Sequence, residues 1–447
     1  MKPIEIKTNC CQPQEELQQV SNHQYNKHLP IAVIGAGPVG LAATAHLVSY
    51  DQPFILLESG SKVGENILTW GHVQVFSPWK YNIDKTALKL LKKQDWNVPN
   101  QNELPTGKEL VDQYLKPLSN TPEIKNSLFM NTKVISISRK NTDKMKTANR
   151  DQQPFVIYAE QGNELVQFEA RAVIDATGTW GNPNPANSNG IWLKEEKDIK
   201  NQIFYGIPDI LGKDKDRYLN KRVAVVGSGH SAINSLLELA KLKEEHPATE
   251  IIWILRKNSV KDAFGGELDA LEARGALGSH IHNLVDANTF EVITPFRIQR
   301  IHEKEGKIEL IGESKGELTT ISDIDEMVVN TGNRPDFSNS SELRTRIDTA
   351  TESVKDLAPL IDPNIHSCGT VRPHGEKELR QPEKDFYIVG AKSYGRAPTF
   401  LMATGHEQVR SIVAYLSGDY EASEKVELEL PETGVCSTNL NAANSCC

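Results

Sequence analysis

Two segments of the chain repeat one pattern of apolar and polar positions. Each begins with a short apolar run, passes through a glycine-rich turn and continues into an apolar, helix-length stretch; the segments are Ile31–Leu47 and Val223–Ala240. A later apolar run that ends in Thr-Gly follows each of them, at Ala172–Gly178 and at Met327–Gly332. Short apolar runs bounded by turn residues are typical of buried strands in parallel sheets. The pattern therefore predicts two related strand–turn–helix units in one chain.

Three further segments read as antiparallel strands: Lys133–Ser138, Phe155–Ala159 and Leu165–Ala170. Strands that alternate with helices predict an α/β protein, here with two Rossmann-like dinucleotide-binding domains, the second inserted into a discontinuous first domain. The boundaries that we expect are a mobile N-terminal arm over 1–29, the first domain over 30–185 and 326–420, the inserted domain over 186–325, and a C-terminal tail with a Cys pair over 421–447.

The first glycine turn has the spacing of a dinucleotide-binding fingerprint. Gly35 permits the tight turn, Gly37 lets the backbone approach a pyrophosphate, and Gly40 lets the helix pack on the strand. The helix that begins beside Pro38 presents free N–H groups and the positive end of its dipole to the phosphates. The next strand ends in Glu58, which is placed to accept hydrogen bonds from a ribose. The turn is predicted to bind a dinucleotide.

The second turn repeats this spacing with alanine in place of the third glycine, which the fingerprint allows. Its phosphate-binding positions are Gly227, Ser228, Gly229 and Ala232. The strand that follows ends in Arg256 and Lys257, where the first unit has an acid. Cations at this position favour a ribose that carries a 2′-phosphate, so this site is predicted to prefer NADPH to NADH.

Composition and charge exclude several classes of protein. The 447 residues include 50 Lys and Arg against 59 Asp and Glu, and the net charge of −9 disfavours a nucleic-acid-binding protein. The longest apolar stretch, Ile31–Val48, is interrupted by glycine and proline and predicts no membrane span. Residues 1 to 30 lack the apolar region of a secretory signal, and six cysteines in so long a chain do not make a disulfide scaffold, so we expect a cytoplasmic protein. No H-E-x-x-H motif, serine elbow or Walker loop is present, and no metal site is expected.

Two C-terminal segments add a resemblance to a known family. Phe386-Tyr-Ile-Val-Gly390 and Ala397-Pro-Thr-Phe-Leu-Met-Ala-Thr-Gly-His-Glu407, taken with the two turns, resemble the two-dinucleotide-binding-domain flavoproteins over nearly the whole chain. The resemblance implies that the first turn binds FAD and the second binds NADPH. It further implies positions near the domain junction for Thr177, Gly178, Thr331 and Gly332, positions by the ribityl phosphate arm of the flavin for Gly390 and Ala391, and a helix start near Thr399 that faces the pyrimidine edge of the flavin.

Other motifs bear on the subfamily. The sequence has no C-x-x-C or C-x4-C pair, which dithiol reductases of this architecture need at the flavin. Flavin-containing (class B) monooxygenases carry F-x-G-x-x-x-H before the second turn; Phe204 and Gly206 match this motif, and Ile210 stands where the histidine is expected. The flavin-binding monooxygenases found with bacterial arsenic-resistance genes are more closely resembled, in the segments Ala273–Gly278, Ser367–His374, Lys392–Pro398 and Pro431–Cys436. This resemblance implies a monooxygenase that uses NADPH and O2 to form a peroxyflavin, which oxygenates a soft centre such as trivalent arsenic or antimony.

The cysteines suit chemistry with such a centre, because thiolates bind soft, thiophilic species. Substrate capture is assigned to Cys10, Cys11, Cys436, Cys446 and Cys447. Cys368 is the candidate catalytic residue near the flavin, since its neighbours Arg372 and His374 would favour its thiolate.

Two alternatives remain open. One is an NADPH-dependent flavin reductase that acts on a small disulfide, a quinone or a metal ion. The other is a cysteine-dependent flavoprotein that binds a metalloid with little turnover. The expected partners are NADPH, a small-molecule substrate and, for a monooxygenase, O2; no nucleic acid or membrane is expected, and a homodimer is compatible with the sequence.

Overall fold

Two five-stranded sheets, parallel throughout, organise the protein. The structure is a computed structural model and describes residues 28–263, 272–364, 374–398 and 400–428. The first sheet has the order β16-β7-β1-β2-β3, formed by β16 (Phe386–Ile388), β7 (Ala172–Asp175), β1 (Ile31–Ile34), β2 (Phe54–Leu57) and β3 (Leu128–Phe129). The second has the order β11-β10-β9-β15-β8, formed by β11 (Glu291–Ile293), β10 (Glu250–Ile254), β9 (Arg222–Val226), β15 (Glu326–Val329) and β8 (Ile203–Tyr205). The repeated apolar runs therefore form buried parallel strands, as predicted.

Two three-stranded antiparallel sheets accompany the parallel ones. One contains β4 (Thr132–Arg139), β5 (Phe155–Gln161) and β6 (Glu164–Ala170), which confirms the three antiparallel strands predicted from the sequence. The other contains β12 (Arg297–Lys304), β13 (Lys307–Ser314) and β14 (Glu317–Ile324).

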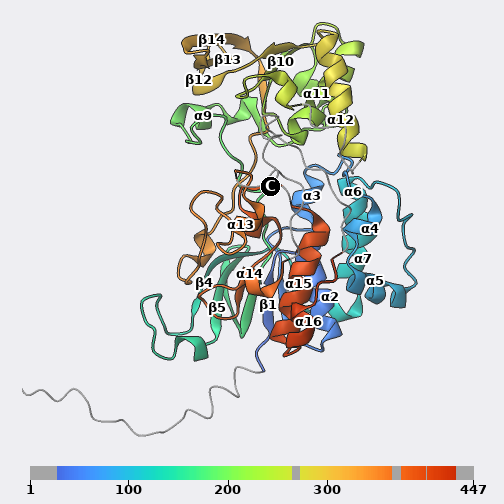
Figure 1. Cartoon of the computed structure of the whole chain (residues 1–447), viewed down its shortest axis with the longest axis vertical. Helices are drawn as coiled ribbons and strands as arrows, with labels where there is room; N and C mark the ends of the chain where they lie inside the picture. Colours follow the sequence, from blue (N-terminus) through green and yellow to red (C-terminus); the bar gives the residue numbers. More distant parts are fainter. Residues whose placement is uncertain (1–27, 264–271, 365–373, 399, 429–447) are drawn as a thin grey trace, which may run out of the picture.

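Helices complete two lobes that lie along the long axis of the molecule (Figure 1). We call the lobe that contains β1 the first unit and the lobe that contains β9 the second unit. The helices of the first unit are α2 (Pro38–Ser49), α3 (Glu65–Leu68), α4 (Trp79–Asn82), α5 (Lys85–Leu91), α6 (Gly107–Glu109), α7 (Lys116–Ser119), α8 (Pro122–Lys125), α13 (Ala358–Ile361), α14 (Glu376–Leu379), α15 (Met402–Leu416) and α16 (Tyr420–Glu424). Those of the second unit are α9 (Lys194–Asp198), α10 (Lys215–Tyr218), α11 (His230–Glu245) and α12 (Glu272–Asp286). Short 3-10 or π turns are η1 (Lys92–Gln94), η2 (Leu110–Leu115), η3 (Arg150–Gln152), η4 (Lys200–Gln202), η5 (Val260–Ala263), η6 (Ser338–Ser340) and η7 (Gly390–Tyr394).

The helix after each glycine turn is covered to a different extent. Helix α2 is buried from Val39 to Leu47, because α15 packs along it and apolar or small residues occupy nearly all of its positions. Figure 1 shows α15 beside α2 in the lower lobe. Helix α11 buries one face only, as its alternation of apolar and charged residues requires. Among the described helices, none combines the length and the apolar composition that crossing a membrane would demand.

The chain enters and leaves the second unit through two connectors that pair with each other. The Asn184 N–H donates to the Gly332 carbonyl and the Arg334 N–H to the Asn182 carbonyl, each at 2.9 Å, so the connectors run antiparallel. The sequence placed the return to the first domain at residue 326. Strand β15, however, pairs with β9 and β8, so residues 326–329 lie in the sheet of the second unit. The return follows this strand, because the strand that ends in Thr-Gly completes the second sheet.

Candidate functional site

The first glycine turn has the backbone that a phosphate cradle needs. Gly35 has a φ of +97°, and a Cβ atom there would lie 2.9 Å from the Ala176 carbonyl oxygen. At Gly40 a Cβ would overlap the Gly35 carbonyl oxygen. At Gly37 a Cβ would meet nothing within 4 Å, so this side of the turn is open. Two glycines thus permit close packing and the third leaves room beside the N-terminus of α2, which fits a bound pyrophosphate.

Glu58 is held beside this turn by two backbone hydrogen bonds. Its Oε2 accepts from the Ala36 N–H at 2.6 Å, and its Oε1 accepts from the Gly60 N–H at 2.7 Å. The side chain is only 9% exposed. The carboxylate is therefore oriented next to the open side of the turn, at the position from which the fingerprint acid binds a ribose.

A buried ion pair that the sequence did not predict lies at the end of β7. The Lys392 ammonium donates to Asp175 Oδ2 at 2.6 Å and to Thr177 Oγ1 at 3.0 Å. The Lys392 and Asp175 side chains are 1% and 0% exposed. The pair ties η7 to the first Thr-Gly segment. An aspartate at the end of an otherwise apolar strand was the available signal, but nothing local identified its partner 217 residues away.

Gly390 lies against the helix of the first turn. It has a φ of +67°, and a Cβ there would lie 3.2 Å from the Val39 side chain. Its N–H donates to Gln408 Oε1 at 2.7 Å, and Gln408 Nε2 in turn donates to Ser393 Oγ at 3.0 Å. The structure therefore brings Gly390 and the neighbouring Ala391 close to the start of α2. Helix α15, which follows, begins at Met402.

The second glycine turn repeats the same geometry. Gly227 has a φ of +136°, and a Cβ there would clash with the Asn330 carbonyl oxygen at the end of β15. At Gly229 a Cβ would meet nothing within 4 Å. Ala232 is fully buried at the position equivalent to Gly40. This turn also leaves one open side at a helix N-terminus, that of α11.

A cavity of about 1300 Å³ opens on the second turn. It gathers predicted site residues from three separate segments: Gly227, Ser228, Gly229, Arg256, Lys257, Thr331 and Gly332. Residues of the first unit, among them Trp180, Arg396 and Pro398, complete the lining. The cavity therefore lies at the junction of the two units, and its volume suits a dinucleotide.

Two asparagines on the cavity wall carry buried acceptor atoms without a hydrogen-bond partner among the described residues, Asn184 Oδ1 and Asn330 Oδ1. Their amide nitrogens are anchored, since Asn184 donates to the Thr331 carbonyl at 3.1 Å and Asn330 to the Gly206 carbonyl at 2.7 Å. A buried acceptor left unpaired is costly, so these oxygens fit a ligand with N–H or O–H donors, such as a nicotinamide or a ribose. Neither asparagine was predicted from the sequence, because the environment of each depends on contacts between distant segments.

Cationic residues line the cavity where the preference for a phosphorylated ribose was predicted. Arg256 and Lys257 follow β10, and Arg297, which the sequence did not single out, begins β12. The Arg256 guanidinium reaches the Ser188 carbonyl at 3.4 Å. Cations that follow β10 fit a 2′-phosphate, to which guanidinium groups bind strongly.

Several predicted residues do not lie in the described parts of the chain. Thr399 and all six cysteines, Cys10, Cys11, Cys368, Cys436, Cys446 and Cys447, fall outside those ranges. Ile210, which stands where the monooxygenase motif has histidine, is fully buried in the core of the second unit and is not among the cavity residues.

Comparison with known proteins places this geometry in a family. The sequence profile described as pyridine nucleotide-disulphide oxidoreductase matches residues 32–367. A ferredoxin–NADP reductase from Lactobacillus johnsonii is 24% identical over 348 residues, which cover 76% of this chain and 85% of that protein.

Solved structures share the fold. The bacillithiol disulfide reductase Bdr (YpdA) from Bacillus cereus is 16% identical with a TM-score of 0.61, and the match covers 87% of this chain and 99% of that one. FAD-bound DfoA, a cadaverine monooxygenase from Erwinia amylovora, is 13% identical with a TM-score of 0.63, and the match covers 91% of this chain and 98% of that one. One architecture thus serves both reductases and monooxygenases among these relatives.

Proposed function

The chain belongs to the pyridine nucleotide-disulphide oxidoreductase family, and from that premise we propose that it is an NADPH-dependent flavin monooxygenase acting on a soft nucleophilic centre. It is a flavoprotein oxidoreductase that uses FAD and NADPH. The observation that carries the finer proposal is the lack of any C-x-x-C or C-x4-C pair in a sequence with two nucleotide cradles. Electrons that leave the flavin then have no such dithiol to reduce, and we infer an acceptor from outside the chain.

The first unit fits FAD. Gly37 leaves space for the pyrophosphate at the N-terminus of α2, and Glu58 is oriented to accept hydrogen bonds from the adenosine ribose. When bound, FAD supplies the redox chemistry, accepting a hydride and passing two electrons on. The Lys392–Asp175 pair fixes η7 next to this site and so holds the backbone of Gly390 against α2.

The second unit fits NADPH. Gly229 leaves the cradle for its pyrophosphate open, and Arg256 with Lys257 supplies positive charge for the 2′-phosphate. The aromatic residues Phe76, Trp180 and Tyr205 line the same cavity and exclude water from part of it. The chain's own residues therefore bind, orient and shield the reductant.

We propose trivalent arsenic or antimony as the substrate class. The support is the resemblance of four segments to the monooxygenases of arsenic-resistance genes and the six cysteines, which suit a thiophilic substrate. The overall reaction balances when NADPH, H⁺, O2 and arsenite give NADP⁺, water and arsenate. One oxygen atom goes to arsenic, the other goes to water, and NADPH supplies two electrons.

The test is to measure NADPH oxidation and O2 uptake by the purified holoprotein with and without trivalent arsenic. We expect arsenite to stimulate both at a ratio near one, and pentavalent arsenic to accumulate. Equal NADPH oxidation under nitrogen with the same substrate would contradict a monooxygenase. Tight arsenite binding without turnover, lost when Cys10, Cys11, Cys446 and Cys447 are all changed to Ser, would instead indicate a binding protein.

A second candidate, an NADPH-dependent reductase, is favoured by the relatives named ferredoxin–NADP reductase. It predicts oxygen-independent reduction of a ferredoxin, quinone, small disulfide or metal ion. An anaerobic assay with these acceptors distinguishes it from the monooxygenase, because only the reductase turns over without O2.

A further inference from the structure

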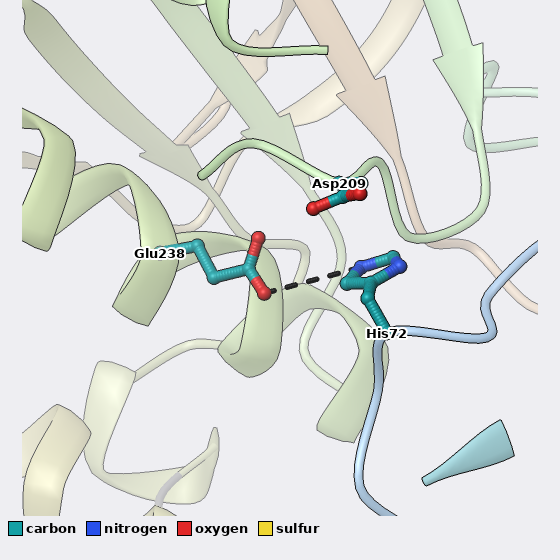
Figure 2. Close-up of side chains that lie close together, drawn as sticks. All are labelled: His72, Asp209 and Glu238. Atoms are coloured by element: carbon teal, nitrogen blue, oxygen red, sulfur yellow. Dashed lines mark ion pairs between the residues drawn. The ribbon is translucent and has the colours of Figure 1, made fainter. Parts of the chain in front are cut away.

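A histidine of the first unit meets two acids of the second unit outside the cavity (Figure 2). His72 lies in the loop between α3 and α4, Asp209 precedes α10, and Glu238 lies in the middle of α11. Their potential ligand atoms all lie within 4.8 Å of one another. His72 Nε2 lies 3.9 Å from Glu238 Oε1. Residues far apart in the sequence therefore form one compact nitrogen and oxygen ligand set across the junction.

This arrangement is incomplete as a hydrogen-bonded cluster. His72 Nε2 is buried and has no hydrogen-bond partner among the described residues, because 3.9 Å is too long for a hydrogen bond. Backbone groups orient the acids, since Glu238 Oε2 accepts from the Ile210 N–H at 3.1 Å and Asp209 Oδ2 accepts from the Lys213 N–H at 3.3 Å. The imidazole nitrogen therefore faces oriented carboxylates at a distance that leaves space between them.

The three groups are partly withdrawn from water, with the His72 and Glu238 side chains 17% and 23% exposed. Two carboxylates this close to each other repel, and a cation bound between them offsets the repulsion.

We propose that His72, Asp209 and Glu238 bind one divalent transition-metal ion, for which Zn²⁺ is the best probe, and that this ion links the two units. One imidazole and two carboxylates suit Zn²⁺, with bonds of about 2.0–2.2 Å. Tetrahedral ligands at those lengths lie about 3.4 Å apart. The present atoms lie within 4.8 Å of one another, so small rotations of the three side chains toward a common centre bring them to that spacing, with water completing the coordination.

The ion would also restrict the motion of the loop 72–76, which contributes Phe76 to the lining of the NADPH cavity. Phe76, four residues after His72, packs on His230 with ring centroids 5.0 Å apart, and both residues line the cavity. His230 is the first residue of α11, the helix that carries Glu238. The loop 72–76 therefore contacts α11 near its start and near its middle. A metal ion bound between His72 and Glu238 would therefore hold Phe76 against His230.

Calorimetric titration of the holoprotein with ZnCl2, after its thiols are alkylated with iodoacetamide, tests the site without any turnover. We expect one ion per chain, with a dissociation constant of about 1 μM or lower. His72→Ala and Glu238→Gln should each weaken binding at least about tenfold. Glutamine keeps the shape and a carbonyl acceptor for the Ile210 N–H, and circular dichroism checks that each variant is folded. His282→Ala is the matched control, because His282 lies 3.5 Å from Asp286 on the surface of α12.

The outcomes separate this site from the proposed function. Binding to the wild type and to His282→Ala, with loss in the two site variants, supports the site whatever the substrate proves to be. Absence of a saturable site in the wild type overturns the proposal. Unchanged affinity in folded His72→Ala and Glu238→Gln proteins overturns it as well.

Discussion

The two glycine turns have the same backbone in different surroundings. In both, the first glycine has a positive φ and closes on the carbonyl of the strand ending in Thr-Gly, and the second leaves an open side. The strand after the first turn ends in a buried carboxylate, Glu58, that is fixed by two N–H groups. The strand after the second ends in Arg256 and Lys257 on a cavity wall. The helices differ too, since α2 is buried on all sides and α11 on one.

One backbone motif in these two surroundings suits two modes of binding. In the first unit, close packing around the turn favours a cofactor that is retained. In the second, a cavity between the units favours a cofactor that binds and leaves. The shared backbone has the shape that suits a pyrophosphate, and the end of the following strand is the position at which such folds select the ribose. Substitutions in one unit test this difference, because the cofactor site of the other unit should stay intact.

The largest effect is expected for Gly40→Ala, because the added methyl overlaps the Gly35 carbonyl oxygen and forces α2 away from β1. We expect a loss of stability of about 4 kcal/mol or more and a protein purified largely without FAD. The flavin absorbance per chain and thermal unfolding measure this. The matched change in the second turn, Ala232→Gly, should cost about 1 kcal/mol and leave the FAD content unchanged. Similar behaviour of the two variants would show that the turns are not packed differently.

Lys392→Met should give the next largest effect, since it leaves the Asp175 carboxylate buried and unpaired. Removing one partner of such a pair costs about 3–5 kcal/mol. Thr331→Val is the control, at the end of the corresponding strand of the second unit. The Thr331 hydroxyl donates to the Asn184 carbonyl at 3.0 Å, and its loss should lower the free energy of unfolding by about 1 kcal/mol. Urea unfolding compares the two. A Lys392→Met protein as stable as the wild type would contradict the assigned role of the pair.

Arg256→Ala should raise KM for NADPH about tenfold to a hundredfold and change KM for NADH little, because a charge-assisted contact to phosphate contributes about 1.5–3 kcal/mol. FAD content should stay the same. Arg300→Ala, an exposed arginine on β12 that does not line the cavity, is the control. Steady-state kinetics with both nucleotides measure the effect. Equal increases for NADPH and NADH would rule out a phosphate contact.

The smallest effect concerns the acid stability that a buried ion-pair cluster gives to the first unit. In the first unit, burial opposes ionisation of Glu383, but hydrogen bonds from Arg150 and Arg139 outweigh it and lower its pKa. Its stabilisation is therefore present above the unfolded pKa of about 4.5 and is lost as the pH falls through the lower folded pKa. The stability difference between wild type and Glu383→Gln should shrink below pH 4.5, as measured by urea unfolding at several pH values. A difference that is constant down to pH 2 would contradict this assignment.

The sequence predicted the turns and the parallel strands because those features are local. Glycine spacing, the apolar runs and the charge after each strand all lie within short segments. The Lys392–Asp175 pair, Arg297 and the two cavity asparagines were missed, because each acquires its role through contacts between distant segments. The His72 cluster was missed for the same reason: its three residues come from both units.

The paired connectors have a mechanical consequence. Two strands that hydrogen-bond to each other at residues 182–184 and 332–334 can twist as one ribbon, but neither can lengthen without breaking the bonds between them. A relative motion of the lobes that keeps these bonds intact is a swivel about this ribbon. Such a swivel would slide the walls of the junction cavity past each other while the lobes stay joined. A cross-link on one flank of the ribbon would stop it.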